Sequence, residues 1–290
     1  MAFTIKELES LSGIKAHTIR IWEQRYNFLK PGRTTTNIRK YNNEELKTLL
    51  TVALLNKYGY KISQIDEMPN DQRISAVLQL QEPEAKDRYL VNELIGFMVE
   101  LKSTEFEERL NWHINQNGLS ASIKIIFQFL EKVGLLWQSN KVNPAQEHIA
   151  ANIIRQKIIS AIDQFPLNVQ DQPTALLFLP EYEHHELGLL FVYYLFKKKG
   201  IACVYLGANV PLKDLEYIVE AKHPDFLYTH LTSFPRQLQF EKFIQQLSVQ
   251  SGDAKILISG AAITGYSKSL PANVRLLESF LQVSTFISNL

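Results

Sequence analysis

The sequence predicts three folded segments: a small helical head with a two-stranded wing, a helical bundle, and a doubly wound α/β domain with a parallel sheet. Short helical patterns separated by turn signals fill residues 1–68, and long helical patterns with almost no strand signal fill 75–167. Short apolar runs then alternate with amphipathic helices over 168–290. The length of 290 residues is about twice that of a typical single domain, which agrees with several compact units.

The composition is that of an ordinary folded protein. Hydrophobic residues make up 46% of the chain and charged residues 21%, a balance that excludes an intrinsically disordered protein. The chain has no apolar stretch long enough for a membrane span, and its start, MAFTIKELES, has no secretory signal, so we expect a cytoplasmic protein without a membrane partner. The single cysteine, Cys203, lies in the apolar run IACVYL and is predicted to be a buried strand residue.

Charge is distributed unevenly along the chain. Residues 1–65 contain eleven Lys or Arg and five Glu, a net charge of +6. The remainder contains 20 basic and 25 acidic residues, a net charge of −5. A basic head is suited to phosphate contact, although a solvated basic face would give the same count.

The head begins with two short helices joined by a glycine. In TIKELESLSG the apolar residues share one face, Thr4 is placed at the N-cap, and Glu7 completes a capping box. Gly13 permits a sharp turn into KAHTIRIWEQRY, in which Ile19 and Trp22 can face inward. This helix-turn-helix pattern commonly presents a row of side chains to a DNA groove.

A wing and a capped helix complete the head. Between Leu29 and Tyr41, the sequence KPGRTTTNIRKY has no helical period but carries a Pro-Gly turn signal, β-branched threonines and four basic residues, which predict two short strands. Asn42 or Asn43 then caps a helix with glutamates in its first turn.

The middle segment reads as consecutive helices. We expect them over 71–81, 84–102, 103–118, 120–138 and 143–165, and the last four suggest a bundle. Their starts are marked by Ser103, Ser120 and Asn143 as caps, with Pro144 suited to a first helical position.

The last segment is a flavodoxin-like α/β unit by its pattern. Candidate strands at 174–180, 202–207, 225–231, 254–260 and 273–277 are separated by helices at 184–199, 211–222 and 235–249. Such alternation implies a parallel sheet covered on both faces, with ligands at the carboxyl ends of the strands. Functional residues are therefore expected in the loops after the first, third and fourth strands. The C-terminal helix, SFLQVSTFISNL, is expected to pack rather than to contact a membrane.

The head resembles the MerR family of transcription regulators. The matching residues are T-I-K-E-L-E-S-L-S-G-I at 4–14, H-T-I-R-I-W-E-Q-R-Y at 17–26 and R-T-T-T-N-I-R-K-Y at 33–41. The resemblance implies that the second helix enters the major groove while the wing straddles the phosphate backbone. The DNA-binding residues that it predicts are Thr4, Lys15, His17, Thr18, Arg20, Arg25, Arg33, Arg39, Lys40 and Tyr41.

Two motifs lie in the rest of the chain: residues 137–148 read W-x9-E-H, and residues 183–188 read E-x-H-x-x-G. The second is similar to the D-x-H-x-x-G motif of cobalamin modules. Together they make this part of the chain resemble the cobalamin-binding half of the MerR subfamily that includes light-sensing repressors of carotenoid synthesis. The cofactor-binding residues that this implies are Trp137, Glu147, His148, Glu183, His185, Gly188, Thr229, Leu231, Gly260 and Ala261.

The motif after the first strand implies a cobalt ligand. By the resemblance, His185 presents a ring nitrogen to cobalt in place of the cofactor's own lower base, and the Glu183 carboxylate fixes the tautomer through the other nitrogen. Gly188 would leave room for the nucleotide tail beside the helix. A solvated loop histidine is the ordinary alternative for His185, just as Trp137 alone would be a core aromatic.

Two later motifs complete the resemblance, each with a residue that differs from the family pattern. Thr229 and Leu231 stand in place of a Ser-x-Leu whose hydroxyl bonds the displaced base, and Gly260 and Ala261 stand in place of a Gly-Gly that packs against the tail. Glu183 for aspartate and Thr229 for serine keep the functional group, whereas the methyl of Ala261 can exclude a close neighbour.

The resemblance implies a transcription regulator, most simply a repressor, rather than an enzyme. Cobalamin, in an adenosyl or methyl form, would control its oligomerisation or its affinity for a DNA operator. One alternative is a regulator whose cobalamin-like fold has lost its cofactor and acts through protein contacts. A cobalamin-dependent methyl-transfer component is less favoured, because the chain has no catalytic partner domain.

Two further expectations concern assembly and light. Residues 66–73, DEMPNDQR, interrupt the chain where the dimerising helix of other MerR proteins begins, so we expect a dimer or tetramer formed through the C-terminal half. Gln138 stands where similar light-sensing members carry a histidine that captures cobalt after photolysis. Glutamine is a poorer cobalt ligand than imidazole, so switching is expected to be weaker or driven by the presence of the ligand.

Overall fold

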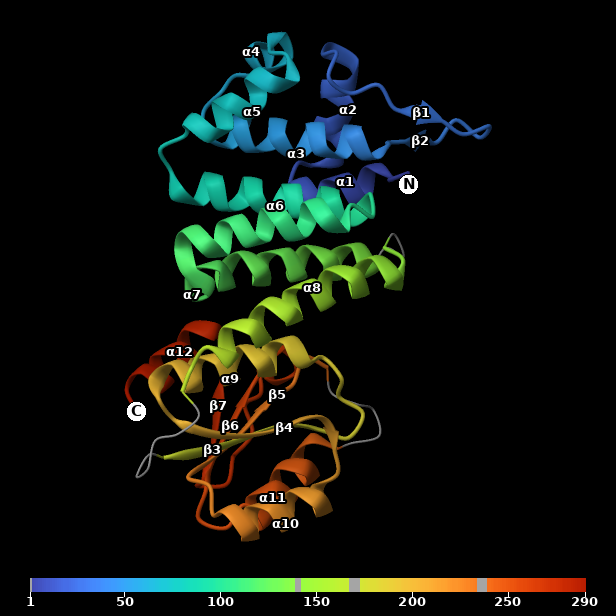
Figure 1. The fold of residues 1–290 in the computed structure, drawn as a ribbon. Coiled ribbons are helices and arrows are strands. Elements are labelled where there is room, and N and C mark those ends of the chain that lie inside the picture. Colours follow the sequence, from blue (N-terminus) through green and yellow to red (C-terminus); the bar gives the residue numbers. More distant parts are fainter. Residues whose placement is uncertain (1, 139–141, 167–172, 234–238) are drawn as a thin grey trace. The chain divides into compact units, whose positions relative to one another are not determined.

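The computed structural model describes residues 2–138, 142–166, 173–233 and 239–290 (Figure 1). The chain divides into two compact units, Met1–Ile154 and Arg155–Leu290. The head and most of the helical bundle thus share the first unit. The boundary predicted between residues 167 and 168 lies outside the described residues, and so does the start of the helix expected at 235.

The predicted helix-turn-helix and wing are present in the head. Its elements are α1 (Ile5–Ser12), α2 (Ala16–Arg25), β1 (Gly32–Arg33), β2 (Arg39–Lys40), α3 (Asn43–Lys57) and α4 (Ile62–Glu67). In the capping box of α1, the backbone N–H of Thr4 donates to Glu7 at 2.5 Å. Gly13 has a φ of 75°, the left-handed conformation that turns the chain into α2. Asn42 caps α3 by accepting the backbone N–H of Glu45 at 2.9 Å.

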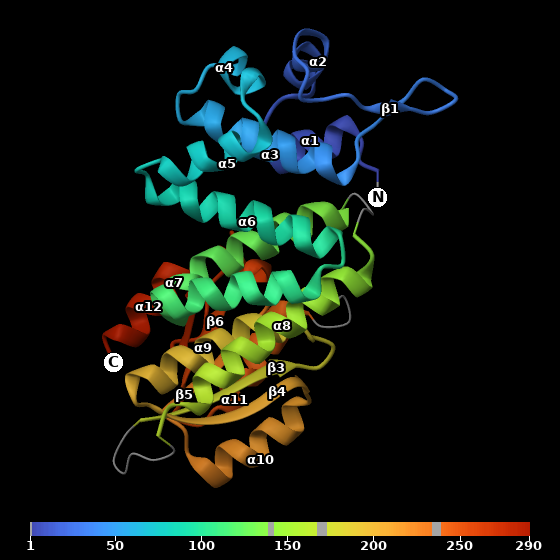
Figure 2. The ribbon, with the colours of Figure 1, turned by 45° about the horizontal axis from the view of Figure 1, so that its top comes forward.

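The helices of the middle segment also follow the prediction. They are α5 (Asn70–Gln79), α6 (Pro83–Val99), α7 (Ser103–Gln138) and α8 (Pro144–Asp163). Gly118, with φ 76° and ψ 160°, breaks α7 at the boundary expected between two helices. Ser103 and Ser120 lie within α7 rather than before a helix, whereas Asn143 accepts the backbone N–H of Ala145 at 2.9 Å. Figure 2 shows α6 and α7 side by side, and the two helices pack together.

The head is joined to the bundle by packing as well as by the chain. Helix α3 packs against α6, and Lys47 on α3 forms an ion pair with Glu100 at 2.5 Å. The stem of Lys47 crosses α6 at Gly96, where a Cβ would lie 3.0 Å from the Lys47 Cε. Helix α4 ends at residue 67 and α5 begins at residue 70, so the expected interruption after the head is present.

The second unit is a five-stranded parallel sheet with strand order β4-β3-β5-β6-β7, the flavodoxin-like order. Its elements are β3 (Thr174–Pro180), α9 (Glu186–Lys199), β4 (Ala202–Val210), α10 (Leu212–Lys222), β5 (Phe226–His230), α11 (Phe240–Gln250), β6 (Lys255–Ser259), the 3-10 turn η1 (Ala261–Ile263), β7 (Val274–Leu277) and α12 (Phe280–Ser288). Every predicted strand is thus present.

Two apolar layers hold this unit together. Helices α10 and α11 cover one face of the sheet over Leu176, Leu227 and Ile256, and α9 and α12 cover the other over Leu177 and Leu257 (Figure 1). Side chains alternate between these faces along each strand. The C-terminal helix α12 packs against α9, as expected. Among the described residues, none of the helices combines the length and apolarity that crossing a membrane requires.

Candidate functional site

The head exposes a basic face on α2. Lys15, His17, Arg20 and Arg25 are exposed, while Ile19 and Trp22 on the opposite side are buried, as predicted. Thr18 is partly buried on the same helix, and Thr4 is partly buried at the cap of α1. Lys15 lies 3.3 Å from Glu9, in a surface ion pair that competition from phosphate can replace.

The sequence did not indicate Glu23, which holds the wing against α2. Its carboxylate accepts a hydrogen bond from Arg39 Nε at 2.6 Å and another from the Tyr41 hydroxyl at 3.2 Å, and it lies 3.6 Å from Arg33 Nη2. Lys40 is exposed on β2. Tyr41 is fully buried, which corrects the expectation that it contacts phosphate directly. Together with Arg39 it positions the wing.

The W-x9-E-H residues lie on the surface of the helical bundle. Trp137 has 45% of its surface exposed, too much for the core aromatic of the ordinary interpretation. His148 is exposed, and its Nδ1 lies 3.4 Å from the Glu147 carboxylate. The exposure of Trp137 and His148 is compatible with a ligand-facing surface. The side chain of Gln138 lies outside the described residues.

The E-x-H-x-x-G motif forms a hydrogen-bonded carboxylate–imidazole pair after β3. His185 Nδ1 lies 2.6 Å from Glu183 Oε1, and because a carboxylate can only accept, the ring nitrogen donates. This tautomer places the lone pair on Nε2, the atom through which a histidine binds a metal. The side chain of His185 is 62% exposed, whereas the Glu183 side chain is buried. A buried carboxylate thus orients an accessible imidazole.

Glu183 also ties two loops together. It accepts the backbone N–H groups of His184 and His185, each at 2.9 Å, and that of Ser233, after β5, at 2.9 Å. Burial alone raises the pKa of Glu183, but the hydrogen bonds from His185 and Ser233 outweigh it and hold the pKa at about 2. The carboxylate is therefore ionised at neutral pH. The loops after the first and third strands, two of the three in which functional residues are expected, meet at this site.

Thr229 lies on the other face of the sheet from Gly188. In register it pairs with Phe178 and Ile258, which belong to the apolar layer beneath α10 and α11. Gly188 is on α9, which covers the opposite face. This corrects the expectation that Thr229 and Gly188 contact one nucleotide tail, because neighbouring strand residues point to opposite faces. The Thr229 hydroxyl is buried and has no hydrogen-bond partner among the described residues.

The residue that faces Gly188 is His230, which the sequence analysis missed. A Cβ on Gly188 would lie 2.2 Å from His230 Cδ2 and 2.3 Å from its Nε2, so only glycine fits there. His230 Nδ1 lies 2.8 Å from the Ser259 hydroxyl, which also bonds the hydroxyl of Tyr228. Burial lowers the pKa of His230 to about 4, which leaves the ring neutral at pH 7. His230 could have been found from the sequence as a polar residue within a predicted buried strand, between Thr229 and Leu231.

Gly260 is required by the protein itself. It has a φ of 108°, and a Cβ there would lie 2.2 Å from the backbone oxygen of Leu231. Leu231 is buried beneath α10 and α11 and donates its N–H to Ser259 at 2.7 Å. Ala261 is exposed at the start of η1. The close approach therefore joins the ends of β5 and β6, and both residues lie at the carboxyl edge of the sheet.

Glu186, next to the proposed ligand, forms a second polar link. It accepts from Arg155 Nε on α8 at 3.0 Å and from the Tyr205 hydroxyl on β4 at 2.8 Å. The end of α8 is thereby tied to the first turn of α9. Cys203 lies on β4 as predicted, but it is only partly buried, and burial raises the pKa of its thiol to about 12.

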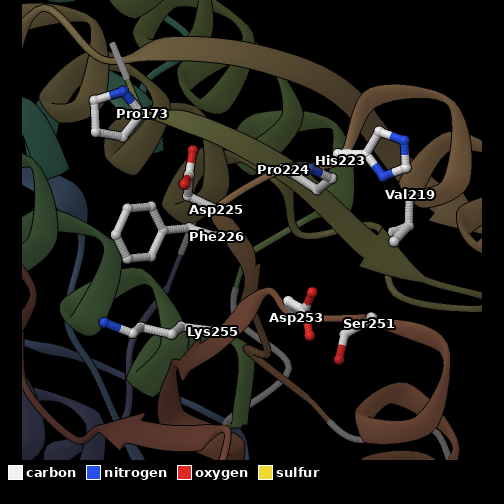
Figure 3. A pocket seen from close by; sticks show the side chains of 10 residues that line it. Pro173, Val219, His223, Pro224, Asp225, Phe226, Ser251, Asp253 and Lys255 are labelled. Carbon is white, nitrogen blue, oxygen red and sulfur yellow. The ribbon is translucent and has the colours of Figure 1, made fainter. Parts of the chain in front are cut away.

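A cavity of about 370 Å³ lies at the opposite, amino-terminal edge of the sheet, where β3, β5 and β6 begin (Figure 3). Pro173, His223 and Lys255 are among its lining residues. Asp225, also in the lining, accepts the backbone N–H of Thr174 at 2.8 Å and so closes the strand ends. The cavity includes none of the predicted cofactor residues and is separate from the site.

Two family models match the chain. Residues 3–71 match the MerR HTH family regulatory protein, and residues 90–160 match the B12 binding domain, which here comprises the later part of α6, α7 and most of α8. Over these two segments the chain is thus similar to a MerR-type head and to a B12-binding region.

Two transcriptional repressors and one corrinoid protein are similar to the chain. It is 25% identical over 252 residues to the HTH-type transcriptional repressor CarH of Myxococcus xanthus, covering 78% of this chain and 77% of that protein. It is 28% identical over 259 residues to the repressor CarA of the same organism, covering 85% and 81%. Among solved structures, the monomethylamine corrinoid protein of Methanosarcina barkeri matches with a TM-score of 0.57 and 14% identity, covering 70% of this chain and 100% of that one. This last likeness shows the fold.

Proposed function

Because the chain joins a MerR HTH head to a B12-binding domain and is homologous to two transcriptional repressors, we propose that it is a cobalamin-controlled repressor that binds duplex DNA. Cobalamin binding would change its oligomeric state or its affinity for an operator. The head would supply phosphate and major-groove contacts through the exposed basic residues of α2 and the wing. The protein would act in the cytoplasm and would not be an enzyme.

The observation that carries this proposal is the buried Glu183 carboxylate that orients the exposed His185 ring at 2.6 Å. His185 Nε2 would bind cobalt in place of the cofactor's own lower base, and Glu183 would fix the orientation of the ring by accepting the hydrogen bond from Nδ1. When bound, cobalamin supplies a cobalt that can carry an adenosyl or methyl group on its other face. The resemblance also assigns cofactor-binding roles to Trp137, Glu147 and His148.

The test is an absorption titration of the full chain with hydroxocobalamin. The native chain should show the spectral change of histidine ligation, and His185→Ala should lose it. His184→Ala, an exposed neighbour, is the matched control and should behave as the native chain. If the native chain changes neither the absorption spectrum of hydroxocobalamin nor its own thermal unfolding when the two are mixed, that result would falsify the proposal. Saturating ligand should raise stability by about 2.7 kcal/mol at a hundredfold excess over Kd.

A second candidate is a regulator that has lost its cofactor and acts through protein contacts. The observation in its favour is that the space beside Gly188 is taken by the His230 ring. The same titration separates the two candidates, because a chain of the second kind would bind its operator but would not change the cobalamin spectrum. We expect assembly as a dimer or tetramer through the C-terminal half under either candidate function.

A further inference from the structure

Gly188 and His230 form a matched pair between α9 and the sheet. The distances of 2.2, 2.3 and 2.7 Å from a hypothetical Gly188 Cβ to three ring atoms show that the imidazole lies directly against the first turn of the helix. Gly188 is buried, so its missing side chain is not exposed to solvent but is replaced by this ring. The room that the glycine leaves is thus filled from within the protein.

Hydrogen bonds hold the ring in that place. Ser259 is buried and lies within hydrogen-bond distance of both Tyr228 and His230. A serine hydroxyl has one hydrogen, so it donates to at most one of these neighbours and accepts from at least one of them. Displacing the ring would break the His230–Ser259 hydrogen bond but would leave the Tyr228–Ser259 hydrogen bond intact.

We propose that His230 determines which corrinoids the site accepts, by disfavouring those that carry a nucleotide base and favouring those that lack one. The proposal rests on the proposed function, in which the nucleotide tail lies beside Gly188. A corrinoid without the base can reach His185 while the His230 ring stays in place. A complete cobalamin must first move the ring and give up its bond to Ser259.

The expected effect is a ratio of affinities. Losing one ordinary hydrogen bond corresponds to about a tenfold change in Kd. The native chain should therefore bind aquocobinamide about tenfold more tightly, relative to hydroxocobalamin, than His230→Ala does. In that variant the affinity for hydroxocobalamin should rise while the affinity for cobinamide changes by less than about twofold. His223→Asn, an exposed histidine at the other edge of the sheet, is the control and should keep the native ratio.

Each outcome of this titration decides something. If both corrinoids bind and His230→Ala leaves their ratio unchanged, His230 has no part in selection and this inference is overturned, while the proposed function stands. If neither corrinoid binds the native chain or the variant, the proposed function itself has failed.

A measurement without ligand tests the geometry and guards against a misfolded variant. Gly188→Ala should strongly destabilise the native chain in urea, because its new methyl collides with the His230 ring. In the His230→Ala background the same change should cost much less, since the ring is gone. Equal costs in the two backgrounds would show that the ring does not fill this space and would overturn the inference.

Discussion

Glu23 divides the basic residues of the head into two kinds. It pairs with Arg39 at 2.6 Å, which makes that guanidinium part of the scaffold, while Lys40 beside it is exposed. The pairing joins residues sixteen positions apart, on a helix and on a wing strand. No periodic pattern records such a contact, so the sequence assigned both residues to phosphate. His230 was missed for a similar reason, because its partners Gly188 and Ser259 are distant in the chain.

The two wing residues should therefore respond differently to substitution. Lys40→Ala should lower DNA affinity on every sequence and reduce the slope of log affinity against log salt by about one unit. Arg39→Ala should also weaken binding, but mainly by releasing the wing, and should lower the free energy of unfolding by about 1 kcal/mol. Fluorescence anisotropy across a salt series and urea unfolding measure both. An Arg39→Ala/Lys40→Ala chain with unchanged affinity and salt dependence would contradict the wing assignment.

Thr229 offers a stability test of its placement. Its buried hydroxyl has no partner among the described residues, so Thr229→Val should raise the free energy of unfolding by about 1 kcal/mol. Ser259→Ala, which removes a hydroxyl with two partners, should lower it. Urea unfolding compares the two. A loss of cobalamin affinity in Thr229→Val would restore the role that the resemblance gave to this hydroxyl.

At the scale of elements, the sequence predicted the presence and order of helices and strands better than the direction of their side chains. Residues 226–231 read FLYTHL, in which apolar or aromatic side chains occur on both faces. A parallel strand buried on both sides has no alternation of polarity, so the pattern cannot tell which face Thr229 or His230 occupies. The register with β3 and β6 settles it. Helix breaks were easier to predict, because Gly118 and Pro144 act locally.

The packing of α7 against α6 contains a partly buried lysine that predicts a pH dependence. Lys132 Nζ lies 2.6 Å from Asn92 Oδ1, and burial together with Arg88 lowers the pKa of Lys132 to about 8. Between pH 8 and the ordinary pKa of 10.5, the unfolded chain binds a proton that the folded chain does not. The free energy of unfolding should therefore rise with pH across this window, by roughly 1–3 kcal/mol.

Lys132→Met should remove that rise and should be the more stable chain at pH 7. Lys124→Met is the matched control on the same helix, because Lys124 is exposed and paired with Asp87. Urea unfolding at several pH values would measure the difference. A rise of equal size in Lys132→Met and in the native chain would assign it to another group.

At the scale of the whole molecule, the order of the segments was predictable but the grouping was not. Three segments were predicted from the sequence, and their bounds at 1–68, 75–167 and 168–290 remain a prediction. By compactness, the head and bundle form one unit, because α3 packs on α6 and Lys47 lies against Gly96. The contact of Lys47 with Gly96 cannot be predicted from the sequence pattern, because a glycine has no side chain to mark it as a packing position. The alternation that defines the α/β unit, by contrast, extends over more than a hundred residues.

Light provides a test of the full chain. We expect green light to cleave the cobalt–carbon bond of bound adenosylcobalamin without forming a stable adduct with two histidines, because Gln138 is a poor cobalt ligand. Absorption spectra and size-exclusion chromatography before and after illumination should show weaker switching in the native chain than in Gln138→His. A persistent bis-histidine spectrum in the native chain would require another second ligand, such as His148.

Helix α8 runs without interruption from Pro144 to Asp163 across the division between residues 154 and 155. A continuous helix behaves like a screw thread, since each inserted residue advances its far end by about 1.5 Å and rotates it by about 100°. If a regulatory signal depends on the orientation of one unit to the other, the effect of an insertion in α8 should therefore vary with the rotation that the insertion adds. One alanine inserted at this point should disrupt such a signal, and seven should nearly restore it.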